Sequence, residues 1–173
     1  EATRARLARS IEAKARDVSE LVSNVLDLMR FGAGRIPLRR DWETVDDLVG
    51  VALSRLEGRL HEHVVTVALP DDLPAVFVDA GLMIQVLANL LDNAVRHTPP
   101  GTQVAIHGQV RDGNLEIAVE DDGAGLPPGD PDRLFMKFQR GREEGEGGGA
   151  GLGLAICRAI IQAHDGEIHA SNR

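Results

Sequence analysis

The sequence is poor in aromatic residues, in cysteine and in long apolar runs, and each shortage removes a class of function. Only 3% of its 173 residues are aromatic, with no tyrosine, so a stacking platform for single-stranded nucleic acid is not expected. A single cysteine, Cys157, excludes a disulfide framework and a cysteine-based zinc site within the chain. No apolar run approaches the ~18 residues of a transmembrane helix, and the charged first residues do not resemble a signal peptide.

Positive charge is also scarce. Acidic residues outnumber basic ones by 27 to 19, which gives a net charge of −8, so a general nucleic-acid-binding surface is not expected. Hydrophobic residues make up 43% of the chain and charged residues 27%, the balance of a globular protein with a real core. The composition therefore predicts a soluble domain of a reducing compartment that binds no nucleic acid.

The first thirty residues predict one long helix. Apolar residues recur at alternating steps of four and three, and Gly32 and Gly34 then end the pattern. Such a helix is about 45 Å long, more than a compact domain of this size needs. We expect the apolar seam of this helix to pack against a partner; the alternative is that the helix folds back and packs on its own domain. The seam consists of Leu7, Ile11, Lys14, Val18, Leu21, Val25 and Leu28.

After Gly34 the pattern changes to alternating strands and helices. Thr44 is the expected N-cap of the first helix, and Asp112-Gly113 is a strong hairpin-turn signal. Hairpins between helices predict an α+β fold, with a mixed or mostly antiparallel sheet covered on one face. The expected strands are 36–42, 65–69, 76–78, 104–110, 115–119 and 167–170; the expected helices are 45–56, 80–97, 131–138 and 151–165, with a Gly- and Glu-rich loop at 139–149.

A polar stripe interrupts the strongest helical segment. Asn89, Asn93, Arg96 and His97 fall on one helix face because they are spaced by three or four residues. Amide oxygens are hard ligands that suit Mg²⁺. Taken alone, the segment allows an equally good alternative, in which the two asparagines only tether neighbouring loops.

Two glycine-containing strings follow. Asp121 ends an expected strand ahead of Gly123 and Gly125, so its carboxylate can accept a hydrogen bond from an exocyclic amine such as that of adenine. By itself this string also fits an acidic turn. Further on, residues 149–154 alternate glycine with apolar residues at the start of a helix, where free N–H groups form an anion site. Neither a P-loop nor a dinucleotide-binding fingerprint is present.

A fourth string places two phenylalanines three residues apart. Phe135 and Phe138 lie beside Lys137 and Arg140. A small core helix explains the phenylalanine pair at least as well as a nucleotide contact does.

In this order and spacing, the four strings resemble the N, G1, F and G2 boxes of the sensor histidine kinases, within the Bergerat-fold ATPase group. The resemblance covers residues 36–173 and implies an α/β sandwich of the Bergerat type. Residues 38–42, 138–141 and 151–160 resemble the osmosensitive potassium-channel (Kdp) type of sensor kinase in particular. Residues 1–33 are similar to the second helix of the family's dimerisation and phosphotransfer hairpin, which leaves 34–173 as the ATP-binding domain, without its last strand.

The resemblance also implies roles for individual residues. Asn93 would hold Mg²⁺, Asn89 and Arg96 would lie near the phosphates, and His97 would lie beside the ribose or α-phosphate. Asp121 would bind the adenine amine. The remaining expected nucleotide-binding residues are Gly123, Gly125, Lys137, Phe138, Arg140, Gly149, Gly151, Leu152, Gly153 and Leu154, with Arg140, Asn89 and Arg96 as candidate catalytic residues.

One position indicates the reaction. Hydrolytic members of the group, such as DNA gyrase, carry a general-base glutamate four residues before the metal-binding asparagine, where this chain has Asn89. Because an amide cannot act as a base, the sequence favours phosphoryl transfer to a protein histidine over hydrolysis. Of the six histidines only His61 precedes a glutamate, and it lies in an expected loop, so the acceptor is expected on a first hairpin helix outside these 173 residues.

The resemblance implies partners as well. It predicts a homodimer through the N-terminal helix, a sensor region, a response regulator receiver domain, and a cytoplasmic position in a bacterial inner-membrane sensor. The alternative is a regulatory or dimerisation module that binds ATP without transferring it.

Overall fold

The computed structural model describes residues 37–136 and 151–172, together with Leu7, Ala15 and Val22. These three isolated positions are exposed and are helical, as predicted; the other residues of the predicted N-terminal helix lie outside the described part. Within the described part of the chain, no helix combines the length and hydropathy needed to cross a membrane.

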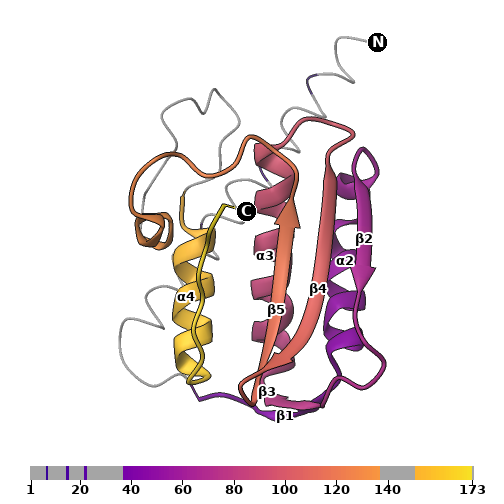
Figure 1. Ribbon diagram of the computed structural model, residues 1–173, viewed down its shortest axis with the longest axis vertical. Helices are drawn as coiled ribbons and strands as arrows, with labels where there is room; N and C mark the ends of the chain where they lie inside the picture. The colour runs from indigo at the N-terminus through magenta and orange to yellow at the C-terminus, as the bar shows by residue number, and fades with distance from the viewer. Residues whose placement is uncertain (1–6, 8–14, 16–21, 23–36, 137–150, 173) are drawn as a thin grey trace.

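In the described part of the chain, five strands form two sheets. The larger contains β2 (Val64–Ala68), β4 (Gln103–Arg111) and β5 (Asn114–Asp121), in the order β2-β4-β5. Strand β2 is parallel to β4, and β5 is antiparallel to β4, so the expected mixed sheet is confirmed. A short ribbon pairs β1 (Asp41–Glu43) with β3 (Val76–Val78) in antiparallel fashion at one end of the domain (Figure 1).

The β4–β5 hairpin confirms the predicted turn. Asp112 and Gly113 connect the strands with φ values of 51° and 80°, the left-handed conformation that a two-residue type I′ turn requires at both positions. The turn sets a register that runs from Arg111 opposite Asn114 to Val104 opposite Asp121. The hairpin therefore carries Asp121 to the end of the sheet far from the turn.

Within 37–136 and 151–172 the α-helices are α2 (Val45–Leu60), α3 (Ala80–His97) and α4 (Gly153–Ala163). Helices α2 and α3 cover one face of the three-stranded sheet, and α4 lies beside α3 (Figure 1). Thr44 caps α2 as predicted, since its side chain accepts a hydrogen bond from the backbone N–H of Asp47 at 3.2 Å. Asp79 caps α3 in the same way through Leu82 N–H.

Helix α3 belongs to both hydrophobic clusters of the domain. On one side Ile84, Leu87, Leu91 and Ala94 join the core between α2 and the sheet. On another side Val86 packs against α4. The α4 side of that second cluster consists of Leu152, Ile156, Cys157 and Ile160.

Two predicted strands differ in the structure. The strand expected at 36–42 is confined to β1, because the N–H of Arg39 donates to the Asp79 carboxylate at 2.9 Å instead of continuing the ladder. The strand expected at 167–170 joins no ladder among the described residues. Instead, this segment runs back along α4 as extended chain, with Ile168 packed on the α4 cluster (Figure 1).

Two predicted helices are shorter than expected. The helix expected at 131–138 is a 3-10 turn, η1 (Pro131–Phe135), because Met136 donates to the carbonyl of Arg133 and is itself extended; residues 137 and 138 lie outside the described part. Helix α4 begins at Gly153, after Gly151 takes a left-handed φ of 65°, and ends before Asp165 at φ 62°.

Candidate functional site

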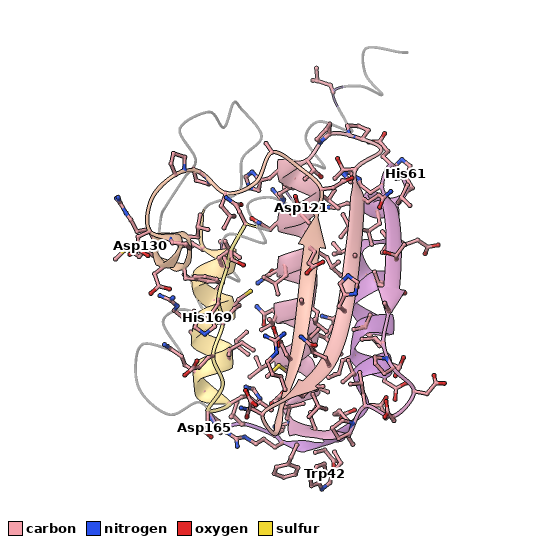
Figure 2. The ribbon with its side chains drawn as sticks, in the orientation of Figure 1. Trp42, His61, Asp121, Asp130, Asp165 and His169 are labelled. Carbon is pink, nitrogen blue, oxygen red and sulfur yellow. The ribbon has the colours of Figure 1, made fainter. Side chains whose placement is uncertain are left out.

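Three elements that carry the predicted site residues meet at one end of the domain. The C-terminal half of α3, the end of β5 and the start of α4 all lie at the end opposite Trp42 (Figure 2). Asn89 of α3 donates to the carbonyl of Gly153 in α4 at 3.5 Å. Thr98, directly after α3, packs against Gly123, directly after β5. The structure therefore gathers three of the four strings that sequence analysis singled out.

The polar stripe of α3 continues, toward the C-terminal end of the helix, the face on which Val86 packs against α4, and its residues belong to neither apolar cluster. Asn89 and Asn93 are half-buried, and Arg96 and His97 are exposed. The amide of Asn89 tethers α4 through Gly153, whereas the amide of Asn93 makes no hydrogen bond to another described residue. The tethering interpretation thus holds for Asn89 alone, and Asn93 keeps an amide oxygen available to a ligand.

Asp92 forms ion pairs with two arginines beside this stripe. Its side chain is 14% exposed and accepts hydrogen bonds from Arg59 of α2 and from Nε of Arg96, the latter at 2.6 Å. Sequence analysis missed this arrangement, although the four-residue spacing of Asp92 and Arg96 is typical of helical ion pairs. The same aspartate and Asn89 line an open cleft of about 440 Å³ between α2 and α3, together with Arg55.

The end of β5 holds a carboxylate in a defined orientation. Asp121 Oδ1 accepts the N–H of Gly123 at 3.0 Å, while Oδ2 receives no hydrogen bond from the described residues. A Cβ atom on Gly123 would lie 2.6 Å from Cγ2 of Thr98 and 2.7 Å from Oδ1 of Asp121. Only glycine therefore fits between Thr98 and this carboxylate.

The second glycine of the string is fixed by a residue from the other end of the sequence. Gly125 has a left-handed φ of 77°. Asn172 Oδ1 accepts the N–H of Leu126 at 2.6 Å, and its amide donates back to the Leu126 carbonyl at 3.4 Å. Sequence analysis missed Asn172, since no local pattern connects residues 46 positions apart.

The first turn of α4 offers backbone donors. The N–H of Ile156 bonds to the carbonyl of Leu152 at 2.9 Å, so the N–H groups of Gly153, Leu154 and Ala155 have no acceptor within the helix. The side chain of Leu152 is 1% exposed and packs in the core. This end can bind an anion through its backbone and its dipole.

The phenylalanine string is described only in part. Phe135 is 5% exposed, and the guanidinium of Arg158 lies 4.7 Å from its ring while bonding to Asp132 at 2.6 Å. The core interpretation is therefore confirmed for Phe135. Lys137, Phe138, Arg140 and Gly149 lie outside the described residues.

The donor set fits a nucleotide-bound Mg²⁺ and does not form a metal centre of its own. Within the ranges 37–136 and 151–172, no group of three or more histidine, cysteine or acidic side chains could hold a metal ion. Mg²⁺ is commonly bound through one or two protein oxygens, with the phosphates of a substrate and water completing its shell. The available amide of Asn93 suits such an ion.

Cys157 is expected to be unreactive in the folded chain. Burial raises its pKa from 9.0 to about 12. At pH 8 the thiolate fraction should fall about 1,000-fold below that of an exposed thiol, so reaction with Ellman's reagent should wait for unfolding. Because the folded pKa lies above the unfolded one, this thiol stabilises the fold below pH 9, and that contribution is lost as pH rises from about 9 to 12.

The predicted loss of stability above pH 9 is tested by urea unfolding at several pH values. The control is Cys157→Ala, in which this pH dependence of the free energy of unfolding should disappear. Rapid labelling of the native thiol at pH 8 would contradict the assignment.

Residues 78–173 match the family described as histidine kinase-, DNA gyrase B-, and HSP90-like ATPases, which covers more than half of the chain. The fold and the site thus define a nucleotide-binding ATPase domain with an α+β sandwich. The chain belongs to the histidine kinase-, DNA gyrase B-, and HSP90-like ATPase family.

Its relatives are sensor kinases, as the sequence resemblance indicates. The chain is 41% identical to the sensor protein KdpD of Escherichia coli (strain K12) over 169 residues, which cover 98% of this chain and 19% of that protein. It is 36% identical to the sensor-like histidine kinase SenX3 of Mycobacterium tuberculosis (strain ATCC 25618 / H37Rv), over 94% of this chain and 40% of that protein. The chain therefore spans less than half the length of either relative.

A solved structure confirms the fold class. The crystal structure of full-length ShkA in complex with AMPPNP superposes with a TM-score of 0.80 and 29% identity, covering 92% of this chain and 34% of that one. The expected mixed α+β sandwich of the histidine kinase catalytic domain is therefore confirmed.

Proposed function

We propose that this chain is the ATP-binding catalytic part of a two-component sensor histidine kinase. It would transfer the γ-phosphoryl group of ATP to a histidine on a hairpin helix, for relay to a response regulator. The observation that carries the proposal is that the C-terminal half of α3 with Asn89 and Asn93, the end of β5 with Asp121 and the start of α4 lie at one end of the domain. The relatives reported above, which are named as sensor proteins or histidine kinases, support it.

Each group has a proposed role at this end. Asn93 would bind Mg²⁺ and Asp121 would accept from the adenine amine. Asn89 and Arg96 would lie near the phosphates, and His97 beside the ribose or α-phosphate. The remaining proposed contacts are the backbone of Gly123, Gly125, Gly149, Gly151, Leu152, Gly153 and Leu154, together with Lys137, Phe138 and Arg140.

Transfer is favoured over hydrolysis because the position of the general base is an amide. The Asn89 side chain donates to the Gly153 carbonyl, and an amide cannot take a proton from water. In the transfer reaction, the bond from the γ-phosphorus to the bridging oxygen of ADP breaks as a bond to an imidazole nitrogen forms. Bound Mg²⁺ supplies charge stabilisation on the phosphates.

The rest of the proposal concerns the longer protein. Residues 1–33 would be the second helix of a dimerisation hairpin, and residues 34–173 the ATP-binding domain. Homodimerisation through that helix, an upstream sensor region and a response regulator partner would follow, on the cytoplasmic side of a bacterial inner membrane. The heptad seam of the first thirty residues supports the hairpin. None of the reported relatives favours the alternative of a regulatory module without transferase activity.

The proposal is tested with γ-labelled ATP. The 173-residue chain alone should bind MgATP but neither label itself nor release phosphate quickly, because none of its six histidines lies in an acceptor context. Adding a separately expressed hairpin that carries a His-Glu-x-x-(Thr/Asn)-Pro sequence should produce an acid-labile phosphohistidine on the hairpin. The matched control is the same hairpin with its histidine replaced by glutamine. Label on His61 or His63, or brisk hydrolysis by the chain alone, would contradict the proposal.

A further inference from the structure

We propose that His63 is a positioning residue for the adenine-binding wall, acting through Thr98 and Gly123 on the carboxylate of Asp121. The inference rests on the nucleotide site proposed above and adds a residue that lies in none of its four strings. His63 is in the loop between α2 and β2, 58 positions before Asp121, the last residue of β5.

The first link joins His63 to Thr98. Nε2 of His63 lies 3.1 Å from Oγ1 of Thr98, and the same hydroxyl donates to the carbonyl of Ala94 at 2.7 Å. Since the hydroxyl proton is used on Ala94, Nε2 of the imidazole carries the proton and donates. Nδ1 of His63 is buried and has no hydrogen-bond partner among the described residues. Within the described structure, the polar contact of this ring is therefore directed at Thr98.

The second link joins Thr98 to Gly123. Threonine is branched at Cβ, so holding its hydroxyl between two partners also fixes the direction of its methyl group. That methyl carbon, Cγ2, lies 2.6 Å from the place of a Cβ on Gly123, which puts the glycine backbone directly against it. Rotation of the Thr98 side chain would therefore remove the methyl contact that supports the Gly123 backbone.

The third link joins Gly123 to Asp121. The N–H of Gly123 donates to Oδ1 at 3.0 Å and so sets the plane of the carboxylate, with Oδ2 left for a ligand. A carboxylate oxygen accepts a hydrogen bond from the 6-amine of adenine. Guanine carries a carbonyl oxygen at that position, which is also an acceptor and is repelled by the carboxylate. The orientation of Asp121 should therefore determine how well the chain distinguishes ATP from GTP.

Removing the imidazole tests this chain of contacts. His63→Leu should weaken ATP binding about three- to tenfold, the range expected for one lost neutral hydrogen bond, and should lower the ratio of ATP to GTP affinity. His63→Gln, which can place an amide donor near the position of Nε2, should restore most of both. His61→Leu is the matched control, because this exposed histidine contacts only the Gly58 carbonyl and Glu62 among the described residues and should leave both affinities unchanged.

The variant Thr98→Val tests the inference independently, in case His63→Leu fails to fold. Thr98→Val keeps the methyl group and removes the hydroxyl, so it should produce the same loss of selectivity. In the double variant with His63→Leu the two losses should not add, because both residues act through one contact.

Calorimetric titration with MgATP and MgGTP gives all of these values. A wild-type chain that binds neither nucleotide would overturn the proposed function and this inference together. A wild-type chain that prefers ATP, with a His63→Leu variant of unchanged selectivity or with additive losses in the double variant, would overturn the inference alone.

Discussion

Replacement of Asn93 by alanine is expected to abolish the Mg²⁺-dependent part of ATP binding. Asn93 lies one helical turn after Asn89, it belongs to neither apolar cluster, and its amide makes no hydrogen bond to another described residue. Groups that merely support a metal ligand are worth about 10- to 100-fold in metal affinity, so a direct ligand should cost at least that much. Calorimetric titration of ATP with and without Mg²⁺ measures the effect.

The variant should change little else. Asn93 is half-buried and makes no hydrogen bond to another described residue, so its loss leaves no described partner group unsatisfied and should not reduce the free energy of unfolding appreciably. Asn114→Ala is the matched control, since it makes the same chemical change at the exposed start of β5, at the opposite end of that strand from Asp121. Wild-type Mg²⁺ dependence in the Asn93→Ala chain would exclude Asn93 as the metal ligand.

Replacement of Gly123 by alanine is expected to cost ATP affinity about 10- to 100-fold, the value of a lost hydrogen bond to a charged group. The added methyl group would lie 2.6 Å from Thr98 Cγ2 and 2.7 Å from Asp121 Oδ1. Thr98 cannot yield easily, because its hydroxyl is bonded to Ala94 and to His63. The carboxylate must therefore move, and the fold should lose about 1–3 kcal/mol through overpacking.

Gly50→Ala provides the control for this prediction. Gly50 lies within α2, and a Cβ atom there would meet nothing within 4 Å. Alanine should stabilise the helix by about 0.5–1 kcal/mol and leave nucleotide binding unchanged. Urea unfolding and nucleotide titration on both variants separate the two effects. If Gly123→Ala bound ATP like the wild type, the orientation of Asp121 would not depend on the glycine.

Local patterns predicted the elements that depend on neighbouring residues. The Asp112-Gly113 turn requires two left-handed residues, which this pair supplies, so the β4–β5 hairpin and the end position of Asp121 followed from the sequence. Helical periodicity is also a local property, so the four-residue spacing correctly placed Asn89 and Asn93 on one face of α3. The roles of these residues toward a nucleotide stay predictions.

The parts that sequence analysis missed or misjudged depend on distant contacts. Asn172 holds Leu126 across 46 positions, and His63 holds Thr98 across 35, so neither pair leaves a periodic signal. The segment 167–170 has the alternation of a strand, yet strand formation also requires a partner edge, and the described chain packs Ile168 on α4 instead. Similarly, the carboxylate of Asp79 accepts a hydrogen bond from the N–H of Arg39, and β1 is therefore shorter than predicted.

The burial of α3 on two sides restricts which substitutions this helix can tolerate. Its buried positions belong to one cluster or the other, and its polar stripe of Asn89, Asn93 and Arg96 belongs to neither. Helix α2, by contrast, contributes to a single cluster and keeps an exposed face. We therefore expect related chains to vary more at the exposed positions of α2 than in α3, where a change disturbs either an apolar cluster or the proposed nucleotide site.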